Sequence, residues 1–334
     1  MPKKRRYTYG DGCMGLSPSV KQILGKIDYA AEALENKLNC NVLLLAFHNY
    51  AYIQSDVMDN LENFLISTNK KYEDRDLCLI LHTLGGDPDV AYHIGVRLQN
   101  LASDKRLLVI IPRMAKSAGT LLACAGDVIY MTPMAELGPV DPQVPVSGTL
   151  WVSAKSIGDS LRMVLEIIIE VLQSKKPAGE IPEMLIRATL SQMPMNAVSH
   201  YDSLLAHVEE LLEDLLSRRM IKDKEVVSLV AEKLTRGYKF HGRVIHLDEA
   251  RKIGLRVESL AGEHLSAVYA VYNRLRDLFT FVDKSLTPIP DILRIISVTS
   301  YNLNHGLVYV PEIPPMADYL TGPISATSTP SPSS

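Results

Sequence analysis

The chain has 334 residues, of which 47% are hydrophobic, and its formal net charge is −3. That length suits one large core with additions rather than several independent domains. The nearly balanced charge excludes a dedicated nucleic-acid binder, because such a protein carries a basic face, and the basic cluster here is confined to residues 3–6.

No stretch of the sequence contains the roughly 18 to 20 uninterrupted apolar residues that a bilayer-spanning helix needs. The N-terminus also lacks the apolar segment of a secretory signal. The cysteines, Cys13, Cys40, Cys78 and Cys124, are far apart and form no CxxC pair or Cys/His cluster. We therefore expect a soluble cytoplasmic protein with buried free thiols, no metal site and no cofactor.

Short apolar runs alternate with helical patterns over the first part of the chain. The apolar runs, which predict strands, cover residues 41–47, 76–81, 106–111 and 128–131. The segments with helical spacing cover residues 18–38, 55–70, 90–101 and 117–126. Because the runs are continuously apolar rather than alternating, they are typical of strands buried on both faces. This order of elements predicts an α/β fold with a largely parallel sheet.

The second half of the sequence is predominantly helical. Amphipathic patterns cover residues 155–173 and 200–219, and a compact unit at 235–260 contains a short strand and a helix. The predicted organisation is an N-terminal extension at 1–27, a main domain at 28–260, a partly helical appendage at 261–320 and a tail at 321–334. The tail is rich in Ser, Thr and Pro, and this composition predicts disorder.

Two successive strand ends carry residues suited to acyl-transfer chemistry. Gly85 and Gly86 follow a buried strand, where glycine allows a backbone N–H to point outward, although such a pair is also typical of a plain turn. Ser117 follows the next strand and opens a helix, where a serine is also a common N-cap. In a parallel sheet both turns lie at the carboxyl edge. The amides of Gly86 and Ala118 are therefore expected to flank one substrate carbonyl.

Together with the glycine pair, three further segments resemble a known group of peptidases. They are Ser-Ala-Gly-Thr at 117–120, Leu-Gly-Pro-Val-Asp-Pro-Gln at 137–143, and a strand-helix unit at 241–255. The helix of that unit contains Glu-Ala at 249–250 and ends in Gly-Leu at 254–255. The chain is similar to the Clp-fold serine peptidases, most of all to the serine dehydrogenase proteinases and next to the signal peptide peptidase A type. The resemblance covers about residues 28–260 and leaves out 261–334.

The resemblance implies a Clp protease/crotonase-like fold of repeated β-β-α units with added helices. It also implies Ser117 as nucleophile, with Gly86 and Ala118 as oxyanion-hole donors and Gly85 supporting the turn. Clp protease has a catalytic histidine where this chain reads Val140-Asp141-Pro142. The signal peptide peptidase A branch uses a lysine instead, and the matching position here is Lys155, which implies a Ser-Lys dyad.

Other residues remain candidates for the proton-transfer role. A lysine acts as a base only where its surroundings lower its pKa, and Trp151 is the apolar neighbour that favours this for Lys155. Otherwise Lys155 is an ordinary solvated helix residue. His82 or His241, oriented by Asp141, is the competing base.

The leading functional prediction is a serine endopeptidase that acts on a peptide or protein through an acyl-enzyme on Ser117. Two alternatives stay open: a crotonase-type enzyme acting on acyl-coenzyme A thioesters, and a catalytically inactive scaffold that binds peptides. Clp-fold relatives commonly assemble, so we expect a homo-oligomer. The sequence has no GxxxxGK[ST] motif, so any ATP-driven unfolding would need a partner, and neither an unfoldase nor a membrane-protein partner is identified.

Overall fold

The computed structural model describes residues 18–68, 72, 74–147, 150–173, 187–188, 195–286 and 298–311. A seven-stranded sheet in the order β10-β11-β1-β2-β3-β5-β9 forms its centre, and β10 is the one antiparallel member among these strands. The strands are β1 (Asn41–Phe47), β2 (Leu77–His82), β3 (Leu107–Ile111), β5 (Val128–Met131), β9 (Val257–Ser259), β10 (Val298–Leu303) and β11 (Gly306–Pro311).

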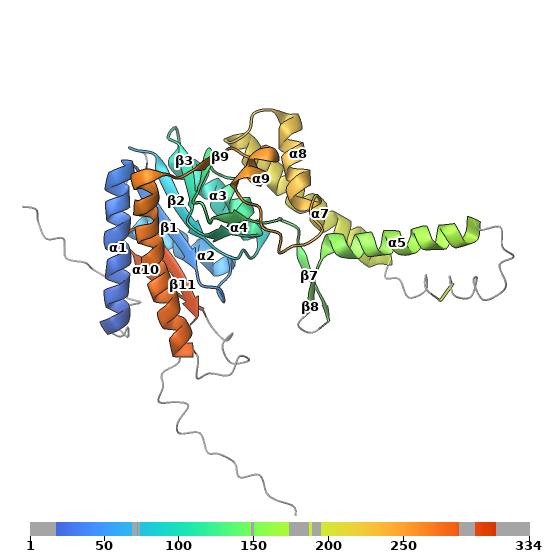
Figure 1. Cartoon of the computed structure of the whole chain (residues 1–334), viewed down its shortest axis with the longest axis horizontal. Helices are drawn as coiled ribbons and strands as arrows, with labels where there is room; N and C mark the ends of the chain where they lie inside the picture. The colour runs from blue at the N-terminus through green and yellow to red at the C-terminus, as the bar shows by residue number, and fades with distance from the viewer. Residues whose placement is uncertain are drawn as a thin grey trace, which may run out of the picture.

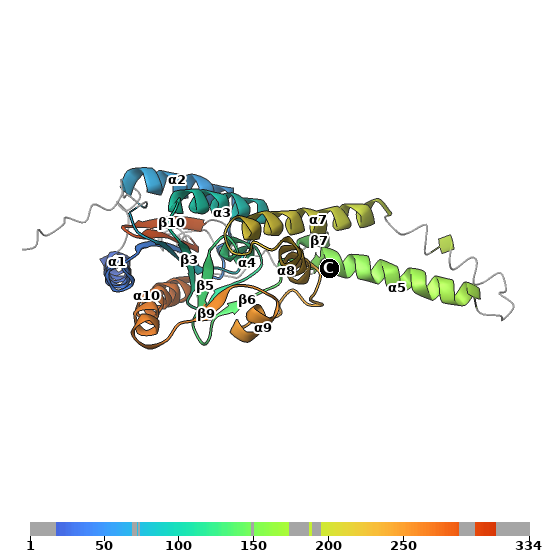
Figure 2. The same ribbon diagram turned by 90° about the horizontal axis from the view of Figure 1, so that it is seen from above.

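Helices cover both faces of this sheet, and a helical arm extends from one end (Figures 1 and 2). One face carries α1 (Pro18–Leu38) and α10 (Gly262–Leu286), and the other carries α2 (Ser55–Thr68), α3 (Pro88–Ala102) and α4 (Ala118–Ala123). The remaining helices are α5 (Ala154–Gln173), α7 (Met195–Arg218), α8 (Lys224–Thr235) and α9 (Leu247–Lys252). The α5 helix projects away from the sheet beside the start of α7.

Two small sheets lie outside the main one. The short strands β4 (Met114–Ala115) and β6 (Glu136–Leu137) pair in parallel. The strands β7 (Gln143–Ser147) and β8 (Leu150–Ser153) form an antiparallel hairpin at the base of α5. The first of these sheets flanks the segment that leads into α4.

The strands bury side chains on both faces, as their continuous apolar sequences predict. In β1, Leu43, Leu45 and Phe47 join the core under α2 and α3. The alternate residues Val42 and Leu44 join the core under α1 and α10. The α/β prediction is confirmed, and the mostly parallel sheet has a ClpP-like fold.

The segment beyond residue 260 is part of the central sheet and core. β11 pairs in parallel with β1, and α10 packs along α1. The described part of residues 261–320, the predicted appendage, contributes α10, β10 and β11 to this fold. The proposed boundary at residue 27 falls within α1. The predicted tail at 321–334 lies outside the described residues.

Cys40, Cys78 and Cys124 are buried and free, as expected, whereas Cys13 lies outside the described residues. Within the described ranges, no group of three or more His, Cys, Asp or Glu side chains is placed to hold a metal ion. No described helix is both long enough and apolar enough to cross a membrane.

Candidate active site

Ser117 lies between β4 and α4 in an unusual backbone conformation, with φ 52° and ψ −122°. A non-glycine residue reaches this region only when its surroundings enforce it, and such strain is concentrated at functional sites. Ser117 is at the N-cap position of α4, yet its side chain makes no capping hydrogen bond. Helix capping therefore does not explain the hydroxyl at this position.

Gly85 packs directly against the backbone around Ser117. A Cβ atom at Gly85 would lie 2.7 Å from the carbonyl oxygen of Lys116 and 2.8 Å from the Cβ of Ser117. Gly85 also has φ 112°, a conformation that side chains with a Cβ rarely adopt. The glycine is therefore required twice over, once for its backbone conformation and once for its close approach to the serine.

The neighbouring Gly86 forms a parallel bridge with Ile53, and the N–H of Gly86 points away from Ile53. The carbonyl of Gly85 accepts the N–H of Ile53 at 2.8 Å, and the N–H of Asp87 donates to the carbonyl of Ile53 at 2.8 Å. No described peptide bond is cis, so the N–H of Gly86 points opposite to the Gly85 carbonyl and away from Ile53. That N–H has no protein acceptor within the described part of the chain.

The amide of Ala118 is the second free donor beside Ser117. Ala118 is the first residue of α4, and the N–H groups of a first helical turn have no partner within the helix. The N–H groups of Gly119 and Thr120 donate back to Lys116 and Ser117. That of Ala118 has no such acceptor among the residues that the structure describes. The predicted pair of amides, Gly86 and Ala118, thus remains available to an external oxygen.

Two buried threonines form hydrogen bonds with these turns, and neither is among the site residues predicted from the sequence. Thr83 accepts the N–H of Gly85 on its Oγ1 at 2.9 Å. Thr120 donates its hydroxyl to the carbonyl of Ala115 at 2.7 Å and accepts the N–H of Gly138 at 3.0 Å. The sequence signal for them was small polar residues two before the glycine pair and three after the serine.

Lys116, next to the nucleophile candidate, has a largely buried side chain that contacts two other segments. Its Nζ donates to the carbonyl of Leu137 at 3.3 Å and to that of Arg243 at 3.1 Å. Burial lowers the pKa of Lys116 from its ordinary value, Glu136 opposes this shift, and Arg113 adds to it. Lys116 thereby ties the serine segment to both the 137–143 segment and the loop that contains His241.

Asp141 and His241 form a close pair on these two segments. The Nδ1 of His241 is 2.8 Å from the Oδ1 of Asp141, and Gln143 donates to the other carboxylate oxygen at 3.1 Å. Asp141 is buried, whereas the His241 side chain is 30% exposed. Within the described chain the Nε2 of His241 has no hydrogen-bond partner. A carboxylate that holds one imidazole nitrogen and leaves the other open is the arrangement of a general base.

Lys155 lies at the start of α5, whose first N–H, from Ala154, donates to the carbonyl of Pro142. Its Nζ is 2.9 Å from the Oδ2 of Asp159, one helical turn further along α5. A small cavity of about 80 Å³ between α5 and α7 adjoins this pair. The side chain of Trp151, the expected apolar neighbour, lies outside the described part of the structure.

His82 is on the opposite side of the sheet from the serine turn. It is the last residue of β2 and is buried against Tyr272 and Phe279 of α10. Among the described residues its Nδ1 has no hydrogen-bond partner, and burial lowers the pKa of His82 to about 4, with further lowering from Arg113 and His48. The structure therefore pairs Asp141 with His241 and not with His82.

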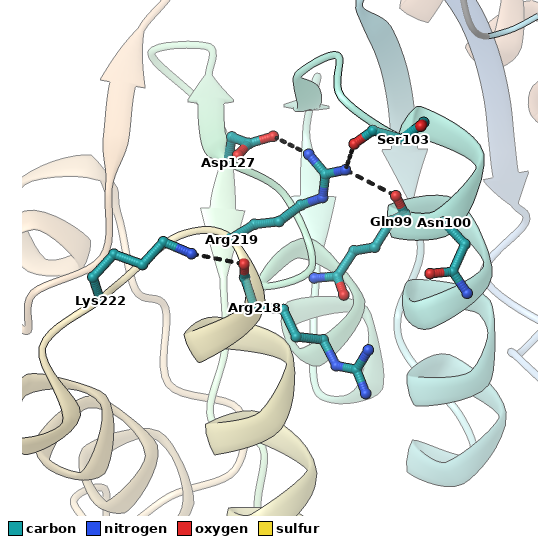
Figure 3. A pocket seen from close by; sticks show the side chains of 7 residues that line it. All are labelled: Gln99, Asn100, Ser103, Asp127, Arg218, Arg219 and Lys222. Carbon is teal, nitrogen blue, oxygen red and sulfur yellow. Dashed lines mark hydrogen bonds and ion pairs between the residues drawn. The ribbon is translucent and has the colours of Figure 1, made fainter.

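A larger hollow of about 600 Å³ lies at the amino edge of the sheet, away from Ser117 (Figure 3). Arg219 crosses it and donates to the carbonyls of Gln99 and Ser103, and to Asp127. Its donors are thus committed to the protein itself. We interpret the hollow as a structural feature, where Arg219 connects α7 to the end of α3 and to the segments that precede β3 and β5.

A ClpP-like fold with a strained serine at the carboxyl edge of its parallel sheet defines the class of ClpP-like serine peptidases. A family model described as ClpP-like SDH-type serine proteinase matches residues 39–277. The chain belongs to this family, as the resemblance in its sequence implies.

Individual relatives are more distant. The chain is 26% identical to the uncharacterized protein MJ0137 of Methanocaldococcus jannaschii over 251 residues, which cover 72% of this chain and 76% of that protein. It is 26% identical to the uncharacterized protein MJ1495 of the same organism over 208 residues, covering 60% of this chain and 59% of that protein. A solved structure of a mutant of the 1510-N membrane-bound stomatin-specific protease covers 82% of this chain and 99% of its own, with 16% identity and a TM-score of 0.38.

Proposed function

We propose that the chain is a serine endopeptidase that hydrolyses peptide bonds through an acyl-enzyme on Ser117. The observation that carries the proposal is the strained, uncapped serine beside two amides that have no acceptor within the described part of the chain. Free N–H groups in fixed positions stabilise the negative charge that develops on a carbonyl oxygen during acyl transfer. Family membership supports the same class of reaction.

In this mechanism the Oγ of Ser117 attacks the peptide carbonyl carbon while a base accepts the hydroxyl proton. The N–H groups of Gly86 and Ala118 hold the resulting oxyanion. The carbon–nitrogen bond then breaks, and the protonated base returns the proton to the leaving amine. A water molecule attacks the acyl-enzyme by the same route, and it releases the acid and restores the serine.

We propose His241 rather than Lys155 as that base, on the basis of the partners that the two side chains have. Asp141 is buried, accepts from Gln143 and holds His241 by one nitrogen, leaving the other nitrogen open for a proton. Lys155 instead contacts Asp159, whose Oδ2 lies 2.9 Å from the Lys155 Nζ. The Ser-Lys dyad that the resemblance implies remains the alternative.

Activity-based labelling with a fluorophosphonate, followed by mapping of the modified residue, tests the nucleophile. We expect the label on Ser117 and none on a Ser117→Ala variant. A label on another serine, or none on an intact folded protein, contradicts the peptidase proposal. Labelling also separates it from a crotonase-type enzyme, which needs no reactive serine.

Matched substitutions test the base. We expect His241→Gln and Asp141→Asn each to lower kcat by about a thousandfold or more, because the proton acceptor is lost or misoriented. Lys155→Met should lower kcat by less than about tenfold, because the loss of an exposed ion pair has little effect on the site. An inactive Lys155→Met enzyme beside an active His241→Gln enzyme would reassign the base to Lys155 and leave Ser117 as nucleophile.

We further propose self-assembly through the α5 arm. Met163, Ile167 and Ile169 are 58%, 53% and 51% exposed on this projecting helix. Exposed apolar side chains that gather on one projecting helix are typical of an interaction surface. Sedimentation at micromolar concentration should give a mass above that of one chain, and Ile167→Glu should reduce it.

A further inference from the structure

Thr83 connects the two turns that carry the proposed oxyanion donors. It follows β2 and is fully buried. Its N–H donates to the carbonyl of Met114 at 3.0 Å, and its carbonyl accepts the N–H of Lys116 at 3.1 Å. These bonds form a bridge with Ala115 outside the main sheet. The backbone of Thr83 is therefore fixed to the strand that leads into Ser117.

The side chain of Thr83 contacts both turns at once. Its Oγ1 accepts the N–H of Gly85 at 2.9 Å, and its hydroxyl approaches the carbonyl of Gly85 at 3.4 Å. Its Cγ2 fills the space beside Gly119, where a Cβ atom would be only 2.4 Å away. The hydroxyl thus holds the glycine pair, and the methyl group packs against the helix start after Ser117.

A glycine pair needs such a restraint because its central peptide can rotate at little cost. Rotation of the peptide between Gly85 and Gly86 would replace the outward N–H with a carbonyl oxygen, which would repel an oxyanion. The bond from Ile53 to the Gly85 carbonyl fixes one side of this unit. The bond from the Gly85 N–H to Thr83 fixes the preceding peptide, between Leu84 and Gly85, and the Thr83 hydroxyl also approaches the Gly85 carbonyl at 3.4 Å.

We propose that Thr83 is a positioning residue that holds the Gly86 amide in the orientation required of an oxyanion donor. The inference rests on the proposed peptidase function and adds a residue to it. Thr83 has no role in proton transfer, since its hydroxyl is committed to the glycine turn. Its effect on catalysis is to keep one donor in place before the substrate arrives. Donors that are oriented in advance account for much of the rate enhancement at such sites.

The test compares three substitutions at Thr83 with a control. Thr83→Val keeps the shape and removes the hydroxyl, Thr83→Ser keeps the hydroxyl, and Thr83→Ala serves if the valine variant does not fold. The control is Thr132→Val, because Thr132 is buried and donates to a backbone carbonyl, that of Pro112, without contact to the glycine turn. Each variant is measured for kcat, KM, fluorophosphonate labelling, urea stability and hydrogen exchange over residues 83–90.

We expect Thr83→Val to lower kcat and the labelling rate by about tenfold to a hundredfold, with KM within about twofold, because the donor is misplaced rather than removed. Thr83→Ser should restore kcat to within about threefold, since its hydroxyl remains. Exchange at Gly85 should be faster in Thr83→Val alone. Thr132→Val should lose comparable stability without a change in kcat.

A Thr83→Val enzyme with unchanged kcat and labelling overturns the inference and leaves the proposed function intact. So does a fall in kcat that Thr83→Ser does not restore or that Thr132→Val reproduces. If the wild-type protein neither hydrolyses peptides nor labels at Ser117, the proposed function fails, and the positioning role fails with it even where exchange at Gly85 rises.

Discussion

Ser117 and Ser103 have almost the same rare backbone conformation at opposite edges of the sheet, with φ 52° and ψ −122° against φ 51° and ψ −118°. Around Ser103 the polar groups are paired. Its N–H donates to Asn100, and its carbonyl accepts from Arg219 at 2.6 Å (Figure 3). Around Ser117 the hydroxyl and the Ala118 amide have no protein partner within the described chain.

The comparison shows that backbone strain alone does not mark a catalytic residue. At Ser103 the strain is part of a tight chain reversal that Arg219 stabilises by pairing with the free carbonyls at the end of α3. At Ser117 the same strain is combined with donors left open, and open donors in a fixed frame are what a reaction centre needs. The state of the surrounding polar groups therefore distinguishes the two serines.

The largest expected effect is on Ser117, the proposed nucleophile. Ser117→Ala should lower kcat by about a thousandfold or more, because the proposed acyl-enzyme cannot form without its hydroxyl. Ser103→Ala should leave kcat unchanged, since its side chain takes no part in the pairing with Arg219. Steady-state hydrolysis of a peptide substrate checks both, with urea denaturation to show that each variant is folded. Equal losses at the two serines would remove the distinction between them.

Arg219 should matter for stability rather than for rate. Arg219→Met removes the side-chain hydrogen bonds to the carbonyls of Gln99, Ser103 and Lys105. It also removes the ion pair with Asp127. We expect a loss of about 3 to 5 kcal/mol in the free energy of unfolding, measured by urea denaturation, with kcat retained in the folded fraction.

Arg218→Met is the control for Arg219, because Arg218 makes a surface ion pair with Asp214. It should cost less than about 1 kcal/mol. A loss of kcat in Arg219→Met, measured at a temperature where the protein is folded, would show that the amino edge of the sheet affects the candidate active site.

His82 lies at the carboxyl edge, and its Nδ1 has no hydrogen-bond partner among the residues that the structure describes. Its buried position predicts a pH effect on stability. Its folded pKa is lowered to about 4 from the ordinary 6.5, so the unfolded chain binds the proton more tightly. Its contribution to stability is therefore fully present above pH 6.5 and is lost as the pH falls towards 4. The loss should total about 3 kcal/mol.

Chemical denaturation at several pH values measures this contribution, and His82→Phe should flatten the profile over the same window. An unchanged profile in His82→Phe would mean that other groups carry the acid sensitivity. Kinetics at neutral pH should differ little between the two proteins, because His82 faces α10 rather than the serine turn.

The smallest expected effect is a gain. Ser103→Gly relieves the positive φ at a position where the side chain is not needed, and it should raise the free energy of unfolding by up to about 1 kcal/mol. Denaturation with and without the substitution measures it, with kcat unchanged. A destabilised Ser103→Gly protein would show that the serine side chain contributes to the turn.

Local sequence patterns predict the layered α/β fold and two parts of the proposed site. Continuous apolar runs such as 41–47 indicate strands buried on both faces, and this follows from local composition. The glycine pair and Ser117 stand at the ends of successive strands, and parallel strands bring such ends to one edge. These features depend on residues close in the chain, so their pattern is readable without coordinates.

Contacts between residues far apart in the chain could not be predicted from the sequence. β11 lies beside β1, although more than half of the chain separates them, and nothing local in residues 306–311 specifies that neighbour. Asp141 pairs with His241 a hundred positions later, whereas His82 turns to the opposite face of the sheet. Pairing between distant residues depends on how whole helices and strands pack together. That packing, rather than the neighbouring sequence, determines which side chains come into contact.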